Sequence, residues 1–82
     1  MFAPMAGIKG VLWLWEASPS RWAEFDETHN CQIEDAYLLS FRSVEIEWEG
    51  VWAATINFKE MEQISHNGVN RSVRRVAVLD AK

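Results

Sequence analysis

The sequence predicts an α+β fold in which about six antiparallel strands form a strongly bent sheet and one helix packs on its concave side. Most segments alternate apolar and polar residues with a period of two, which indicates strands. One segment instead repeats its apolar residues at spacings of three and four, which indicates a single helix. With 82 residues the chain has room for one hydrophobic core, and its five tryptophans are large enough to supply much of it.

The first two strands are predicted in the segment VLWLWEASPSRWAEF, residues 11–25. Trp13 and Trp15 stand two positions apart, as side chains on one face of a strand do. The EASPS stretch that follows contains the proline and polar residues of a turn. Rings return at Trp22 and Phe25, so we expect the two strands to form a hairpin.

The helix is predicted over about residues 29–39. The density of β-branched residues falls there, and Ile33 is followed by apolar residues three and four positions later. Thr28 or Asn30 is expected to cap the N-terminus, since both side chains can accept a hydrogen bond from the first helical turn. Cys31 is expected to be a buried helix residue and, as the only cysteine, cannot form an intramolecular disulfide.

Four further strands are predicted after the helix. The first, SVEIEWEG, alternates apolar residues with glutamates and ends at Gly50. The next, VWAATINF, leads through KEMEQIS to an HNG turn, where Asn67 and Gly68 are expected to adopt positive φ angles. The last strand is VNRSVRRVAVL. The chain is thus divided into a flexible N-terminal segment, the folded domain and a C-terminal tail: residues 1–9, 10–78 and 79–82.

The aromatic residues can serve in two ways. A tryptophan cluster either builds the core of a small domain or lines a site that stacks on a flat ligand. Trp22 and Trp52 are the two rings that we consider candidates for contact with a ligand. The side chains expected in the core are Trp13, Trp15, Phe25, Ile33, Tyr37, Ile56 and Phe58.

Composition limits the classes of function. The chain is 49% hydrophobic and 24% charged, which is ordinary for a soluble globular protein. It has no run of 18 consecutive apolar residues, so no membrane partner is predicted. Its net charge of −4 argues against DNA binding. The single cysteine fits a reducing compartment, and we expect an intracellular protein, nuclear or cytoplasmic.

The charge is divided unevenly along the chain. Residues 1–58 contain three basic and nine acidic residues, a net charge of −6, whereas residues 59–82 contain five basic and three acidic residues, a net charge of +2. An anionic ligand is therefore expected to meet the C-terminal third, around RSVRR.

Enzyme chemistry has little support in the sequence. None of the motifs of hydrolases, metalloproteases or phosphate-binding loops is present. His29, Cys31 and His66 lack the spacing of a metal site and are more simply surface histidines and a buried cysteine. An enzyme would need a base and a nucleophile within hydrogen-bond reach, which the sequence alone does not locate. We predict no catalytic residue, no metal and no cofactor.

The EIEWE segment admits two interpretations. Its acidic residues suggest a calcium or basic-peptide site. A calcium site needs carboxylates that converge on one point, whereas carboxylates at alternate positions of a strand are spread along one face. A solvated strand face is the favoured interpretation.

A group of hydrogen-bond donors, Gln63, Arg71, Arg74 and Arg75, flanks the HNG turn. Exposed arginines on an edge strand can simply promote solubility and prevent edge pairing. Alternatively, arginines and a glutamine amide on paired strands form a donor-rich patch that suits phosphate and ribose oxygens. Facing tryptophans would then stack on an adenine.

The motifs occur in a fixed order: Trp13-x-Trp15, Trp22-x-x-Phe25, IEDAY, INFKEMEQ, and NG followed by RSVRR. Over residues 11–76 this order resembles the WWE domain. That family is named for two tryptophans and a glutamate, matched here by Trp13 or Trp15, Trp22 and Glu34.

The resemblance implies a half β-barrel of antiparallel strands capped by one helix. It also implies a non-catalytic, monomeric module within a longer chain, as in Deltex-like ubiquitin ligases and poly(ADP-ribose) polymerase-like proteins. Several WWE domains bind ADP-ribose, in particular the iso-ADP-ribose unit of poly(ADP-ribose). The expected partners are therefore ADP-ribose or a poly(ADP-ribose)-modified protein, and a ubiquitin-pathway protein.

Site residues follow from the resemblance position by position. Gln63 matches the family glutamine that touches the ligand, Arg71 matches the arginine that holds phosphate, and Trp22 lies where binding members place a ring. Arg74 and Arg75 match the basic pair of the closing strand, of which Arg74 is expected to assist Arg71.

Two positions depart from the family pattern. Leu14 and Ala54 stand where binding members carry tyrosines, and the loss of both rings is expected to weaken binding. Trp52, two residues before Ala54 on the same strand face, is expected to refill that space if the strand is locally shifted.

Two functions follow from these features. The first is recognition of ADP-ribose units. The second is a protein–protein interaction module with a degenerate nucleotide pocket, in which an exposed Trp48 or Trp52 is the anchor and the EIEWE acids form its rim.

Overall fold

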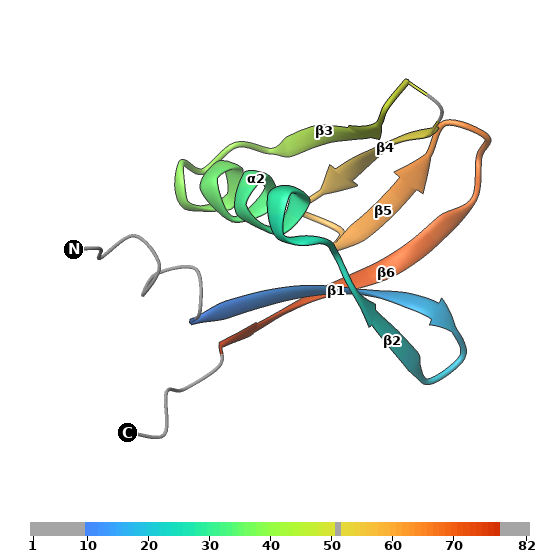
Figure 1. Cartoon of the computed structure of the whole chain (residues 1–82), viewed down its shortest axis with the longest axis horizontal. Coiled ribbons are helices and arrows are strands. Elements are labelled where there is room, and N and C mark those ends of the chain that lie inside the picture. Colours follow the sequence, from blue (N-terminus) through green and yellow to red (C-terminus); the bar gives the residue numbers. More distant parts are fainter. Residues whose placement is uncertain (1–9, 51, 78–82) are drawn as a thin grey trace.

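A computed structural model of the chain describes residues 10–50 and 52–77, which form six strands and one helix (Figure 1). The first segment predicted from the sequence, residues 1–9, and the tail at 79–82 lie outside the described residues, as does residue 78. The elements in chain order are β1 (Val11–Ser18), β2 (Arg21–Glu24), α2 (Glu27–Leu38), β3 (Ser43–Trp48), β4 (Trp52–Asn57), β5 (Glu62–Ser65) and β6 (Asn70–Ala77).

The strands form one antiparallel sheet in the order β2-β1-β6-β5-β4-β3. β6 changes partner along its length: residues 70–72 pair with β5, and residues 73–77 pair with β1. Figure 1 shows the two halves of the sheet turning away from each other along this strand. The predicted α+β, half-barrel-like fold with six strands and a single helix is confirmed.

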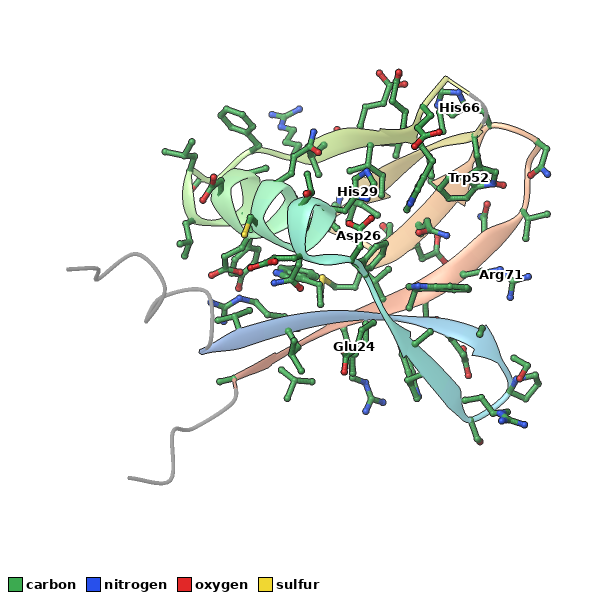
Figure 2. All side chains as sticks on the ribbon, viewed as in Figure 1. Glu24, Asp26, His29, Trp52, His66 and Arg71 are labelled. Atoms are coloured by element: carbon green, nitrogen blue, oxygen red, sulfur yellow. The ribbon has the colours of Figure 1, made fainter. Side chains whose placement is uncertain are left out.

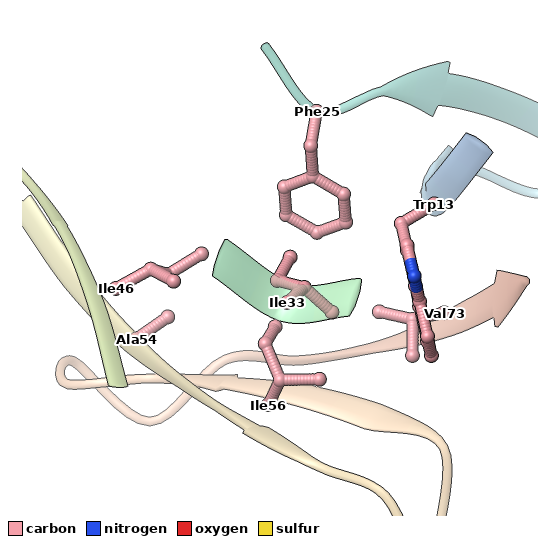
Figure 3. Packing of buried hydrophobic residues seen from close by; sticks show 7 residues of the cluster. All are labelled: Trp13, Phe25, Ile33, Ile46, Ala54, Ile56 and Val73. Carbon is pink, nitrogen blue, oxygen red and sulfur yellow. The ribbon is translucent and has the colours of Figure 1, made fainter. Parts of the chain in front are cut away.

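The hydrophobic core lies between the helix and the two halves of the sheet. Figure 3 shows Ile33 of α2 between the side chains of β3 and β4 and those of β1 and β6. The helix contacts β1 and β3, so it fills the concave side from near one edge of the sheet to the other. The buried cluster consists of Trp13, Phe25, Ile33, Ile46, Ala54, Ile56 and Val73.

Some residues predicted for the core lie at its border. Trp15 and Phe58 are partly buried and pack against the cluster, and Cys31 is half-buried. Tyr37 was expected in the core but is 39% exposed, because it lies near the end of the helix. Its ring packs edge-on against those of Trp13 and Phe58.

The helix begins earlier than the sequence predicts, at Glu27, because Asp26 is its N-cap. The Asp26 side chain accepts a hydrogen bond of 2.8 Å from the backbone N–H of His29, which satisfies one of the free donors of the first turn. The predicted caps, Thr28 and Asn30, are both within the helix.

Asn30 instead joins the helix to the first strand. Its Oδ1 accepts a 2.6 Å hydrogen bond from the backbone N–H of Trp13, and its Nδ2 donates a 3.1 Å bond to the carbonyl of Val11. β1 pairs with β2 only from Leu14 onward, so the Asn30 amide takes the place of a strand partner before that point. Asn30 is 5% exposed, and these bonds are therefore shielded from water.

Replacing Asn30 with alanine is expected to lower the free energy of unfolding by about 2 kcal/mol, because the buried Trp13 N–H loses its partner. Urea denaturation followed by tryptophan fluorescence measures the change. Gln32→Ala is the matched control, since it also removes a side-chain bond to a backbone carbonyl, but an exposed one. Equal losses in the two variants would contradict the structural role of Asn30.

The HNG turn is formed differently from the prediction. Gly68 adopts the expected positive φ, at 93°, but Asn67 does not have a positive φ. The Asn67 side chain instead supports the turn, because its Oδ1 accepts hydrogen bonds from the Ser65 hydroxyl and from the backbone N–H of Val69.

Candidate functional site

A pocket of about 440 Å³ opens between the two halves of the sheet, next to the N-terminal end of the helix. Its aromatic walls come from β1, from the segment between β2 and α2, and from the ends of β3 and β4 that face each other. Polar side chains from β5, β6 and the helix cap complete it. The lining residues are Trp15, Glu24, Phe25, Asp26, Trp48, Trp52, Gln63 and Arg71.

Gln63 and Arg71 lie directly opposite each other on β5 and β6. Gln63 is 4% exposed. Arg71 is half-buried, and its Nη1 donates to the carbonyl oxygens of Glu16, at 3.2 Å, and Ala17, at 2.8 Å. These bonds hold the guanidinium in place, while its Nε and Nη2 donors make no hydrogen bond within the described part of the chain. Arg71 therefore offers a fixed positive charge with free donors at the pocket.

Three indole rings give the pocket its aromatic character. Trp48 and Trp52 are paired across β3 and β4, with ring centroids 4.3 Å apart and planes at 67°. Trp15 lies near Arg71, whose guanidinium carbon is 5.9 Å from the centre of that indole ring. Such walls suit a flat, aromatic ligand.

The acidic side chains of the pocket lining are Glu24 and Asp26, and His29 lies beside Asp26 (Figure 2). His29 Nε2 is 2.9 Å from the Glu47 carbonyl, and because a carbonyl only accepts, this nitrogen carries the hydrogen. His29 Nδ1 is 2.7 Å from Asp26 Oδ1, outside the direction of a good hydrogen bond. The imidazole packs against Trp48 with ring centroids 4.2 Å apart. His29 is only 8% exposed, which corrects the expectation of a surface histidine.

Trp22 and Arg74 lie away from this pocket. Trp22 pairs with Glu16, and Arg74 pairs with Leu14, so all four side chains belong to the sheet face opposite the buried Trp13. The Arg74 guanidinium carbon is 4.1 Å from the centre of the Trp22 ring. Of the five ligand contacts predicted from the sequence, the structure therefore brings together Trp52, Gln63 and Arg71, and places Trp22 and Arg74 on the outer face.

Three aromatic residues of the pocket were not predicted as ligand contacts. Trp15 and Phe25 were expected in the core, and Trp48 was considered only as an anchor for a protein partner. Both tryptophans carried a signal in the sequence: Trp15 shares a strand face with Trp13, and Trp48 lies at the same hairpin end as Trp52. Leu14 points to the outer face and supplies no ring to the pocket, whereas its neighbour Trp15 lines it.

Glu34 and Arg75 form an ion pair in the interior, away from the pocket. Arg75 donates through Nε at 2.9 Å and Nη2 at 2.6 Å, and Trp13 Nε1 donates to the same carboxylate at 2.8 Å. These hydrogen bonds, chiefly that from Arg75, hold the pKa of Glu34 below its usual value. The hydrogen bond to Glu34 in turn raises the pKa of Arg75. Arg75 is thus the structural member of the basic pair.

The other residues considered for chemistry do not converge. Residues 10–50 and 52–77 contain no group of three or more His, Cys, Asp or Glu side chains that could hold a metal ion. Burial, with smaller effects of Glu27 and Asp35, raises the pKa of Cys31, so its thiolate is disfavoured. His66 is exposed and lies 3.0 Å from a Glu45 carboxylate oxygen. The helix described here is too short and too polar to cross a membrane.

Comparison with known proteins identifies the family. The family model of the WWE domain matches residues 11–75, which includes both halves of the sheet, the helix and every lining residue of the pocket. The curated proteins contain no match to this sequence. Domains of the WWE family are non-catalytic interaction modules. Because the match extends over more than half of the chain, this protein belongs to the WWE domain family.

Proposed function

We propose that this domain recognises ADP-ribose units, either free or as iso-ADP-ribose within poly(ADP-ribose) on a modified protein. It would act as a monomeric module of an intracellular protein, nuclear or cytoplasmic, in an ADP-ribosylation or ubiquitin pathway. The observation that carries the proposal is the convergence of Gln63, Arg71 and three indole rings on one pocket of about 440 Å³. Pockets for small ligands commonly have this size and this mixture of aromatic walls and few polar groups.

Each polar group has a distinct role in the proposed complex. The fixed guanidinium of Arg71 has donors left for a phosphate oxygen, and such charge-assisted bonds are among the strongest a protein makes. Gln63 is buried; its amide N–H groups can donate to phosphate or ribose oxygens, and its amide oxygen can accept from a ribose hydroxyl. The indoles of Trp15, Trp48 and Trp52 provide stacking surface for the base.

The position of Ala54 supports weak rather than tight binding. Ala54 is fully buried in the core, so it supplies no ring to the pocket. Trp52, two residues earlier on β4, lines the pocket and supplies a ring there without the local strand shift that the sequence analysis required, because β4 pairs in regular register with β3 and β5. The proposed site therefore contains indoles where the resemblance implies phenols, and it lacks the phenolic hydroxyls as hydrogen-bond partners.

A heteronuclear NMR titration with ADP-ribose, followed by an oligomer that contains iso-ADP-ribose, tests the proposal. We expect saturable shifts of the indole N–H signals of Trp15, Trp48 and Trp52 and of the Gln63 side-chain amide. Raising sodium chloride from about 50 to 300 mM should weaken binding several-fold, because the phosphate contact is ionic. No shift at millimolar ligand, or an affinity that is independent of salt, would refute this mechanism.

A protein–protein interaction module is the second candidate, and the edge strand β3 favours it. Glu45, Glu47 and Glu49 are all exposed there, and half-buried Trp48 and Trp52 lie at the same end. An aromatic anchor with a charged rim is a usual arrangement of an interface. A titration with basic peptides that shifts Trp48 and Trp52, while ADP-ribose shifts neither, would favour this function over the first.

A further inference from the structure

Asp26 presents an unused hydrogen-bond acceptor to the pocket. Within the described residues, the contacts of its carboxylate all involve Oδ1, which accepts from the His29 backbone N–H at 2.8 Å and lies 2.7 Å from His29 Nδ1. Oδ2 has no hydrogen-bond partner in this part of the chain. The side chain is 54% exposed and forms part of the pocket wall. Oδ2 is therefore the oxygen of this pocket residue that is left to accept a hydrogen bond.

The backbone N–H of His29 holds this carboxylate by donating to Oδ1. The imidazole is fixed by its Nε2 bond to the Glu47 carbonyl and by its packing against Trp48. Its buried Nδ1 has no hydrogen-bond partner of its own and lies against Oδ1. Within the described residues, the hydrogen bond of the helix cap is therefore the one that constrains this oxygen. Oδ2 is thus the free end of a side chain whose other oxygen is already held.

The charged side chains that line the pocket favour one orientation of a bound nucleotide. Phosphates are expected beside Arg71 and away from Glu24 and Asp26, because carboxylates repel them. Phe25 and Trp48 line the pocket together with Asp26, and aromatic surface is suited to a base. The edge of the base is therefore expected to face Oδ2.

We propose that Asp26 selects adenine by accepting a hydrogen bond from its 6-amino group. This inference rests on the proposed function, since it concerns how the same pocket reads its ligand. Hypoxanthine has an oxygen at position 6 in place of the amino group. Oδ2 would then face a second acceptor, and both oxygens would lose their partners on binding. The pocket would therefore discriminate between adenine and hypoxanthine, because Oδ2 has a hydrogen-bond partner in the complex with adenine and none in the complex with hypoxanthine.

The test compares ADP-ribose with its hypoxanthine analogue, inosine diphosphate ribose, by isothermal titration calorimetry. Wild-type protein is expected to bind ADP-ribose about tenfold more tightly or better. In Asp26→Asn the preference should fall below about threefold, because a carboxamide can accept from an amino group or donate to a carbonyl. Asparagine is also an effective N-cap, so the helix keeps its capping side chain.

Glu27→Gln is the matched control. Glu27 lies next to Asp26 in the first helical turn and is exposed, but it does not line the pocket, and this substitution removes the same charge. We expect it to preserve the preference for ADP-ribose. An equal reduction in both variants would overturn the hydrogen-bond assignment in favour of a general charge effect.

The remaining outcomes separate this inference from the proposed function. If the wild-type domain binds both nucleotides equally, Asp26 does not read the base, although ADP-ribose recognition stands. If it binds neither, both proposals fail. The wild-type comparison needs no variant, so the inference can be refuted even if Asp26→Asn were to fold poorly.

Discussion

Replacement of Glu34 with alanine is expected to lower the free energy of unfolding by about 3 kcal/mol, the largest stability change among the substitutions considered. Glu34 accepts hydrogen bonds from Trp13 and from two nitrogens of Arg75. Its side chain is 15% exposed and that of Arg75 is 28% exposed, so the variant leaves a largely buried cation and an indole N–H without a partner. Urea denaturation at neutral pH measures the loss.

The same residue should make stability depend on pH. Arg75 lowers the pKa of Glu34 in the folded state, so the ion pair stabilises the fold fully above the carboxyl's unfolded value. That contribution is lost as the pH falls below about 4.5, the ordinary pKa of the carboxyl group, and then through the lower pKa that Glu34 has in the folded state. Wild-type protein should therefore lose more stability than Glu34→Ala between pH 7 and the acid range.

An exposed glutamate provides the control for both measurements. Glu47 lies on β3 with an exposed side chain, and only its backbone carbonyl takes part in a described contact. Glu47→Ala should change stability by less than about 0.5 kcal/mol and leave the pH dependence unaltered. A loss for Glu34→Ala no larger than this control would show that the interior ion pair does not stabilise the fold.

Replacement of Arg71 with alanine is expected to weaken ADP-ribose binding by about 30-fold or more. The substitution removes the fixed positive charge of the pocket and, with it, the donors that remain for phosphate. Arg71→Lys should lose about five- to tenfold, because a lysine ammonium cannot bond two carbonyls and a phosphate with the geometry of a guanidinium. Calorimetry or the NMR titration gives the affinities.

Arg74→Ala is the matched control for Arg71. It removes one arginine from the same strand, but from the outer face, where the guanidinium stacks on Trp22. We expect its affinity for ADP-ribose to stay within about twofold of wild type, apart from a small long-range charge effect. If Arg74→Ala and Arg71→Ala weaken binding equally, the ligand does not occupy the pocket described here. Unchanged spectra away from the site would show that Arg71→Ala is still folded.

The fold was largely predictable because each element has its own periodicity. The alternation of SVEIEWEG gives one exposed, acidic face and one apolar face, and both appear in β3. The start of the helix was not predictable to the residue, because Asp26, Thr28 and Asn30 are all competent caps. Their roles depend on tertiary contacts: Asn30 reaches the backbone of β1, which leaves Asp26 to cap the helix.

The site was predicted less completely, since periodicity tells which residues share a strand face but not which face becomes concave. Trp15 and Trp22 both carry rings near the first hairpin, yet only Trp15 lines the pocket. The register of β1 and β2, which shifts between Glu16 and Ser18, places Trp22 opposite Glu16 on the outer face. Such a bulge has no clear mark in the sequence, and it decides which tryptophan lines the pocket.

The position of β6 has a consequence for how the domain folds. It is the last of the described strands, but it lies between β1 and β5 in the sheet, and its pairing joins Val11 to Ala77. Without it, the β1–β2 hairpin and the β3–β4–β5 meander have no strand in common. Pairing over such long sequence separations is slow, on the order of milliseconds to seconds in small β-rich domains. Because Arg71 itself belongs to β6, a growing chain would complete the pocket only in the closing step of folding, after the other described strands have been synthesised.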